Sequence, residues 1–275
     1  ATPPGVAGFN RMVESNGQLF ALGGNAAVYH SASNGLTWQA TTPVPGVNQV
    51  NISLAADANL LVVLSVDANN TIGAFQSADN ALSWQPLPAF SGQSTFSDQV
   101  FVSNGRIYCY KAADNTLLRL DNSVWTNIQT IIGNQLNFAF YGNKIWAGAN
   151  NILRYSPDNG DSWQVINTPA SFSWLSSIAA DNNRLVLASD VNVYTSSNNG
   201  VTWTTTPLPG GFSMKTLVSN GAWYAWLAQK LYASPDGFLT YTEILDAGSY
   251  IQDMASVNGF LLASANILNR SLQSP

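Results

Sequence analysis

Carboxylates and the single histidine are the side chains of this chain best suited to acid–base chemistry. Asp98 and Asp253 each stand at the entry to an apolar stretch, and a pair of facing carboxylates is what a glycoside hydrolase requires. His30 is the only histidine, and no serine stands in a G-x-S-x-G elbow that could supply a nucleophile for it. We therefore expect no catalytic residues, and glycoside hydrolysis is kept as the less favoured alternative.

Two short segments, 67–70 and 158–161, are rich in side-chain oxygens that could bind calcium. Neither matches an EF-hand, and roughly two to four oxygens from one loop do not fill the six to eight positions around calcium. Cys109 is the only cysteine, which argues against a disulfide framework and against a cysteine-based metal site. The sequence predicts no bound metal and no cofactor, with Cys109 in the hydrophobic core.

Three aromatic residues outside the repeated motif described below could contact a ligand. Trp174 lies in the segment 171–174, and Trp226 and Tyr110 lie near the ends of equivalent apolar stretches. Aromatic rings that carry a polar group suit half-wet surfaces, so these side chains could stack on a sugar or contact a protein. Packing inside the fold is the alternative for all three.

A repeated unit must position these residues, because a short turn motif recurs along the chain. In its clearest copy, 155–163, Ser156 is followed by Asp158, Gly160 and Trp163. The copies end at aromatic residues 38, 84, 125, 163, 203 and 241, which are separated by 46, 41, 38, 40 and 38 residues. A period near 40 residues indicates a repeat architecture. In such a motif Ser and Asp bond the backbone of their own turn, and Gly adopts the left-handed conformation.

A second repeated signal is a tight turn, mostly of the Asn-Gly type, before an apolar stretch. The second residues of the seven turns are Gly17, Asn59, Gly105, Asn143, Asn183, Gly221 and Gly259. Asn-Gly between apolar stretches is the strongest short-range signal for a β-hairpin. The pattern predicts seven hairpins, each followed by a third strand, the Ser/Asp turn and a fourth strand. In the repeat around Trp163 the four strands are expected at 137–141, 144–147, 152–155 and 163–166.

The turn motif resembles the Asp-box, or BNR, repeat of sialidase-like β-propellers, whose pattern is S-x-D-x-G-x-T-W. The period agrees with a four-stranded propeller blade. The resemblance implies an all-β fold in which residues 1–275 form a single domain, a seven-bladed β-propeller of four-stranded antiparallel blades. Residues 1–5 match the end of the first repeat, 40–46, so we expect the N-terminus to help complete the last blade and close the ring.

In propellers of this kind, the linkers between blades share one face with the loops between second and third strands, and ligands generally bind there. Seven polar residues align near the start of the first strand: Arg11, Ser53, Gln99, Asn137, Ser177, Lys215 and Asp253. The resemblance places them near the mouth of the central channel. Our candidate ligand-binding residues are Arg11, Gln99, Lys215, Asp253, Trp174, Trp226 and Tyr110. The alternative is that a channel mouth is polar because it is wet.

The resemblance also suggests sialidase activity, which the arginines do not support. Sialidases bind the substrate carboxylate with an arginine cluster, whose first member lies in an F/Y-R-I-P motif. The segment 9–12 stands at that place but reads Phe-Asn-Arg-Met, and the other arginines fall after turns or on third strands. Glutamate occurs only as Glu14 and Glu243, so the sialidase catalytic set cannot be assembled.

Composition limits the remaining classes of function. Charged residues make up 9% of the chain and the formal net charge is −5, so nucleic-acid binding, which needs a basic surface, is not expected. No apolar stretch of about 18 residues is present, and we expect no membrane insertion. Low charge with abundant Asn, Ser and Thr is common in secreted and virion-surface β proteins, which predicts an extracellular, cell-surface or virion location.

These observations favour a binding module without catalytic activity. Carbohydrate binding on one propeller face, with a glycan as ligand, is the first interpretation. The alternative is a structural or protein-docking propeller of a virion, a surface appendage or an assembly factor, with a protein partner. Propellers similar to this one also serve as assembly factors, for example in photosystem II.

Overall fold

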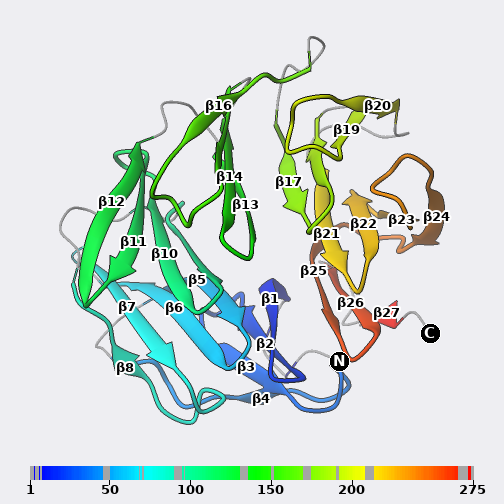
Figure 1. The fold of residues 1–275 in the computed structure, drawn as a ribbon. Helices are drawn as coiled ribbons and strands as arrows, with labels where there is room; N and C mark the ends of the chain where they lie inside the picture. The colour runs from blue at the N-terminus through cyan, green and yellow to red at the C-terminus, as the bar shows by residue number, and fades with distance from the viewer. Residues whose placement is uncertain are drawn as a thin grey trace. The chain divides into compact units, whose positions relative to one another are not determined.

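The structure of this chain is a computed structural model, and its described part consists of β-strands and the turns between them (Figure 1). It describes residues 3, 6, 8–45, 50–67, 69, 71–89, 95, 97–130, 136–149, 152–169, 175–189, 192–207, 214–265 and 272–273. Across these residues, no helix is long and apolar enough to cross a membrane. The chain divides into two compact units, which are described separately.

The first unit, Ala1–Thr130 with Gln252–Pro275, contains three four-stranded antiparallel sheets and one three-stranded sheet. The first sheet consists of β1 (Phe9–Ser15), β2 (Gln18–Gly23), β3 (Val28–Ser31) and β4 (Gln39–Ala40). The second consists of β5 (Val50–Asp57), β6 (Leu60–Val66), β7 (Ile72–Ser77) and β8 (Gln85–Pro86). The third consists of β9 (Gln99–Ser103), β10 (Arg106–Lys111), β11 (Thr116–Asp121) and β12 (Val124–Thr130). The three-stranded sheet consists of β25 (Ile251–Val257), β26 (Phe260–Ala265) and β27 (Leu272–Gln273).

The second unit, Ile131–Ile251, contains three four-stranded antiparallel sheets. Its first sheet consists of β13 (Asn137–Tyr141), β14 (Lys144–Ala149), β15 (Ile152–Ser156) and β16 (Gln164–Ile166). Its second consists of β17 (Ser177–Ala180), β18 (Leu185–Ala188), β19 (Asn192–Ser196) and β20 (Thr204–Pro207). Its third consists of β21 (Lys215–Ser219), β22 (Ala222–Leu227), β23 (Lys230–Ser234) and β24 (Thr242–Asp246). In both units the strands of a sheet pair in chain order.

The hairpins between first and second strands form as predicted, at all seven positions. Asn16 and Gly17, with φ of 51° and 72°, show the reason, because a two-residue hairpin turn needs positive φ at both residues. Asn and Gly reach that region at the lowest cost. The position of each hairpin therefore follows from the local sequence alone.

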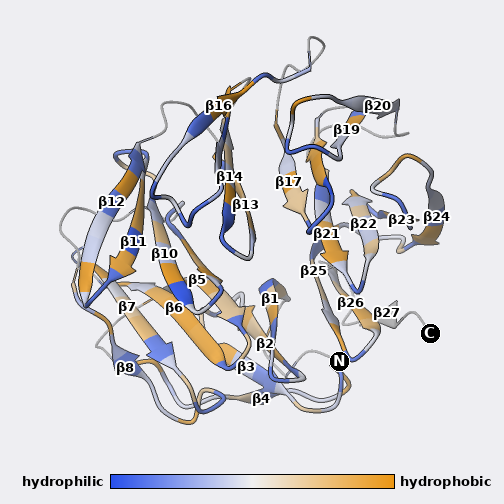
Figure 2. Ribbon diagram, in the orientation of Figure 1, coloured by the Kyte–Doolittle hydropathy of each residue, from blue (hydrophilic) through white to orange (hydrophobic). Residues whose placement is uncertain are grey.

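The second strands of the sheets are hydrophobic and supply much of the buried core of each unit. Every residue of β6 after Leu60 is buried, and Figure 2 shows this strand in the colour of hydrophobic residues. Phe20 and Leu22 of β2 pack with Leu61 and Val63 of β6 in one buried cluster. A second strand is covered on both faces by neighbouring sheets, and this explains its continuous apolar sequence.

The Ser/Asp turns have one hydrogen-bonding scheme, which the clearest copy illustrates. The Ser156 hydroxyl oxygen accepts from the Gly160 N–H at 2.8 Å, and Asp158 accepts from the Ser162 N–H at 2.8 Å and its hydroxyl at 2.6 Å. Equivalent serine bonds close the turns after Ser31, Ser77, Ser196 and Ser234. The predicted structural role of this motif is confirmed.

The aromatic residue that ends the motif also fastens neighbouring repeats to one another. The indole N–H groups of Trp84, Trp125 and Trp203 donate to carbonyl oxygens in the linker of the preceding repeat, those of Thr42, Pro88 and Asn167. The Tyr241 hydroxyl donates in the same way to Pro207. These bonds join consecutive sheets within each unit.

The predicted number of blades is wrong. Six sheets have four strands, whereas the expected seventh four-stranded blade is, in the described residues, the three-stranded sheet β25–β27. The described residues ahead of β1, namely Pro3, Val6 and Gly8, lie in no strand. The Val6 N–H donates to the Pro3 carbonyl at 3.1 Å, and the Val6 side chain is buried with Phe9 and with residues of β25 and β26. The prediction that residues 1–5 help to complete the last blade lies, except for Pro3, outside the described residues.

Candidate functional site

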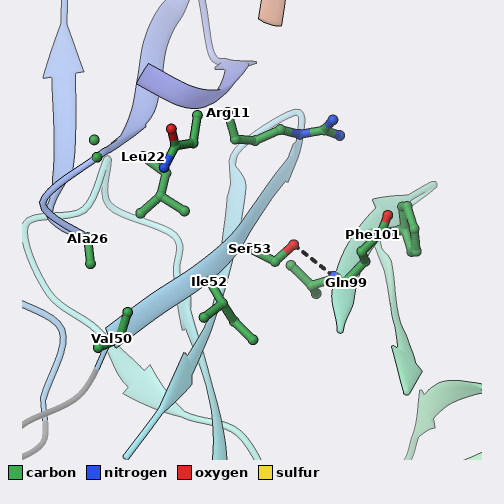
Figure 3. A pocket seen from close by; sticks show the side chains of 12 residues that line it. Arg11, Leu22, Ala26, Val50, Ile52, Ser53, Gln99 and Phe101 are labelled. Atoms are coloured by element: carbon green, nitrogen blue, oxygen red, sulfur yellow. Dashed lines mark hydrogen bonds between the residues drawn. The ribbon is translucent and has the colours of Figure 1, made fainter. Parts of the chain in front are cut away.

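A pocket of about 350 Å³ lies in the first unit, where β1, β5 and β9 begin (Figure 3). Three of the seven aligned polar residues, Arg11, Ser53 and Gln99, line it together. Apolar side chains, among them Ile52 and Phe101, complete the lining. The pocket thus joins hydrogen-bonding groups and a cation to an apolar wall, the usual composition of a ligand site.

Two β-bulges shape this pocket. In β1, Phe9 pairs with Gly23 and Arg11 with Leu22, so that Asn10 is an extra residue. In β5, Asn51 pairs with Ser65 and Ser53 with Leu64, so that Ile52 is extra. The first strands β9, β13, β17 and β21 show no such shift in register. Bulges redirect side chains and concentrate near functional sites, and both of these residues line the pocket.

Several of the aligned polar residues hold neighbouring first strands together. The Ser53 hydroxyl oxygen accepts from the Val100 N–H at 3.1 Å, the bond drawn in Figure 3, and Ser177 accepts from the Thr216 N–H at 3.2 Å. Asp253 is 4% exposed and accepts from the Met12 N–H at 2.7 Å. The predicted ligand residue Asp253 therefore has a structural bond in this fold.

Arg11, Gln99 and Lys215 are the exposed members of the aligned set, whereas Ser53, Asn137 and Ser177 are half-buried. Each directly precedes a residue whose backbone N–H donates a hydrogen bond to a side chain of a neighbouring strand. These following residues are Met12, Val100 and Thr216. Arg11 has no carboxylate within ion-pair distance among the described residues. Its side chain extends from β1 at the pocket in Figure 3. Lys215 lies in the second unit, in the equivalent strand β21.

The two described aromatic candidates, Trp226 and Tyr110, are buried. Trp226 is 4% exposed and Tyr110 is 5% exposed. The Tyr110 hydroxyl donates to Asn115 Oδ1 at 2.8 Å, and burial, with Asp98 and then Asp114 nearby, raises the pKa of Tyr110 to about 12. The third candidate, Trp174, lies outside the described residues. Both described aromatics pack within the fold, which was the alternative interpretation.

The groups considered for acid–base chemistry are occupied by local hydrogen bonds. Asp98 is buried and accepts from the Thr95 hydroxyl at 3.0 Å and from the Ala112 N–H at 2.8 Å. His30 is half-buried, bonds Gln18 and stacks on Phe20, and burial lowers the pKa of its imidazole. Asp98 thus joins two loop segments, and His30 packs against its neighbours.

The part of the chain that the structure describes contains no cluster of side chains that could bind a metal ion. No group of three or more His, Cys, Asp or Glu side chains is assembled there. Asp67, in one of the oxygen-rich segments, accepts from the N–H groups of Asn69 and Thr71 at 2.8 Å each. Cys109 is fully buried, as predicted, and burial raises the pKa of its thiol.

The two bulges were missed because the first strands were aligned at a fixed distance from each hairpin. The spacing of the hairpins does not reveal them either, because the bulge at Asn10 precedes the first hairpin, and the longest interval, 46 residues, contains β9, which has no shift in register.

Comparison with known proteins agrees with a β-propeller fold. The DUF6242 β-propeller domain matches residues 78–218, and no curated protein sequence matches the chain. The structure of YCF48 bound to D1 peptide is similar with a TM-score of 0.71 at 16% identity, over 95% of this chain and 90% of that chain. YCF48 from Cyanidioschyzon merolae has a TM-score of 0.68 at 12% identity, over 96% and 94% of the two chains. The computationally designed protein Ika8 has a TM-score of 0.65 at 15% identity, over 94% and 80%.

Proposed function

The chain belongs to the DUF6242 β-propeller domain family, and we propose that it is a non-catalytic docking module that binds an extended segment of a partner protein. The binding site is the pocket at the start of β1, β5 and β9, and the group it recognises is a carboxylate on that segment. Arg11 carries this proposal, because it is an exposed cation at the pocket without an acidic partner among the described residues.

The chemistry of Arg11 suits a carboxylate. A guanidinium donates two parallel hydrogen bonds to the two carboxylate oxygens, which gives both strength and orientation. At the two bulges, Asn10 and Ile52 stand outside the regular pairing of their strands. In this proposal their backbone groups bond the main chain of an extended peptide, as in strand addition.

The walls of the pocket are held in place before a ligand arrives. The loop after β2 is closed by the bonds Gly23 N–H to Ala27 O at 2.9 Å and Ala26 N–H to Gly23 O at 2.9 Å. The Gly24 N–H donates to the Gly8 carbonyl at 3.0 Å. Ser53 fixes β9 against β5 through Val100. A site built on such fixed elements loses little entropy on binding.

A protein partner is better supported than a glycan. The structurally similar YCF48 has been solved bound to a D1 peptide. The two described aromatic residues on which carbohydrate binding rested, Trp226 and Tyr110, are buried, so neither can stack on a sugar as the fold stands. The hydrogen bonds of the Ser/Asp turns support placing those turns in the Asp-box class, which assigns them a structural role.

The experiment compares peptides that differ only in the carboxylate. An array of extended octapeptides with free carboxyl termini is screened against the full chain, and each hit is remade as its C-terminal amide. We expect hits to lose about tenfold or more in affinity on amidation, because a charge-assisted bidentate pair is broken. Arg11→Gln should produce the same loss for the free acids.

Lys144→Gln is the control for a general loss of positive charge. Lys144 begins β14 at the hairpin end of its sheet, where it pairs with Tyr141. Its removal should leave the affinity for the selected peptides unchanged. Peptides that bind Arg11→Gln as tightly as the unmodified chain, or an array without hits, would rule out this site and this function.

A further inference from the structure

The pocket at the start of β1, β5 and β9 has a polar end and an apolar end (Figure 3). Figure 3 shows the Arg11 side chain on the far side of Ser53 from Val50. Val50 begins β5, and its side chain is 42% exposed. The cation and the aliphatic side chain therefore stand at separate places in one pocket, and a ligand that fills it needs a group for each.

Val50 is the most exposed apolar residue of this lining. Leu22 and Val100 are buried. Ile52 and Phe101 are half-buried, and Ile52 packs against a hydrophobic cluster formed by β5, β6, β7, β9 and β10. These side chains are already covered by the fold, whereas the Val50 side chain is left for a ligand to cover.

The register of β5 against β6 fixes the distance along the strand between Val50 and Ser53. Val50 pairs with Val66. Ser53 pairs with Leu64, which is two residues from Val66 on β6. The extra residue Ile52 thus leaves Val50 and Ser53 as far apart as two residues of a regular strand, about 7 Å.

A spacing of two residues suits an extended peptide. Side chains two positions apart in a strand point to the same face, and the chain between them spans the same distance of about 7 Å. β5 is the first strand in the order of its sheet and pairs within that sheet only with β6. A peptide that lies along the start of β5 therefore presents groups two positions apart to Val50 and to the polar end.

We propose that the partner segment is a free carboxyl terminus with an aliphatic residue, such as leucine, two positions before its last residue. This specificity rests on the docking function proposed above. The terminal carboxylate binds the Arg11 guanidinium, and the aliphatic side chain covers Val50. The carboxylate is the terminal one because a chain end continues in line with the strand, whereas side-chain carboxylates stand perpendicular to it.

The test uses octapeptides with free carboxyl termini that bind the full chain. Leucine and alanine are compared at the position two before the last residue, with all other residues unchanged. We expect the leucine peptide to bind about tenfold more tightly, because its side chain enters an apolar site. Leucine moved one position in either direction should bind like alanine, since its side chain then faces away from Val50.

Val50→Thr locates the site of this preference. Threonine has the shape of valine and suits a strand, but it places a hydroxyl where the aliphatic side chain would pack. The preference for leucine over alanine should fall to about threefold or less, while the loss of affinity on amidation of the carboxylate stays the same. Circular dichroism verifies that the variant is folded.

Val165→Thr is the matched control, because Val165 is an exposed valine of the outer strand β16, in the second unit. This variant should keep the tenfold preference for leucine. The coupling between the peptide change and the Val50 change then measures the contact between the two side chains.

The outcomes separate this specificity from the docking function. Binding that depends on Arg11 and on the free carboxylate, but is equal for leucine and alanine, would overturn the specificity and leave the docking function intact. A leucine preference that is unchanged in Val50→Thr would overturn it as well, because the side chain would then lie elsewhere. Binding that is insensitive to amidation would contradict the docking function and this specificity together.

Discussion

Residues with left-handed backbone conformation control the Ser/Asp turns. Gly200 has φ of 88°, and a Cβ added there would lie 2.5 Å from Ile166 Cγ2, whereas Ala81 occupies the equivalent position with φ of 61°. We expect Gly200→Ala to lower the free energy of unfolding by about 2–3 kcal/mol through backbone strain and overpacking. Ala81→Gly should change it by less than about 1 kcal/mol, because relief of strain offsets the lost methyl group. Urea unfolding of both variants measures the difference, and equal losses would contradict this explanation.

The aspartates of these turns should make stability depend on pH. Hydrogen bonds from the hydroxyls of Ser83 and then Ser77 lower the pKa of Asp79 from 3.8 to about 2. The folded state therefore favours the ionised carboxylate. The stabilisation is complete above the unfolded pKa and is lost as the pH falls from about 4 to about 2. We expect a shallower fall of Tm over this range in Asp79→Asn, measured at constant ionic strength.

Asparagine is a suitable replacement at this position. Asn198 occupies it in another turn, where its side-chain oxygen accepts from the Ser196 hydroxyl and the Thr202 N–H, each at 2.9 Å. The variant should therefore keep its turn at neutral pH. An unchanged acid slope in Asp79→Asn would assign the pH dependence to other groups.

Single side-chain bonds join the elements of each unit. Asp253 of β25 accepts a hydrogen bond from the Met12 N–H of β1 at 2.7 Å, and both residues are buried. We expect Asp253→Ala to lower the free energy of unfolding by about 2–3 kcal/mol, because the buried Met12 N–H is left without its acceptor. The exposed Asp161→Ala should stay within about 0.5 kcal/mol of the unmodified chain. Equal effects of the two changes in urea unfolding would show that this bond does not stabilise the fold.

At the level of elements, the sequence predicted the positions of strands more accurately than the way in which those strands pair with their neighbours. The four strands expected in the repeat around Trp163 agree with β13–β16 to within two residues at every end. The hairpin turns and apolar stretches that define them are local signals. The bulges at Asn10 and Ile52 were missed, because a bulge is set by the pairing of two strands and leaves no local pattern.

At the scale of the whole molecule, the reactivity of the Cys109 thiol can be used to follow unfolding of the first unit. It is fully buried in β10, and burial raises the pKa of its thiol, so both access and thiolate formation are suppressed. We expect a thiol reagent to label Cys109 only as the first unit unfolds, with a midpoint in urea equal to that of its secondary structure. Labelling well below that midpoint would reveal local opening around β10.

The sequence by itself determined the repeats, the turns and the all-β class, because the bonds that make them join residues a few positions apart. The serine of each turn bonds an N–H four residues on, as Ser77 does with Ala81. The tertiary structure alone decided which polar residues became structural and which reached solvent. The bond from Met12 to Asp253 spans 241 residues, and no local pattern distinguishes Asp253 from the exposed Arg11. The packing of Val6 with residues of β25 and β26 is likewise a contact between segments far apart in the sequence.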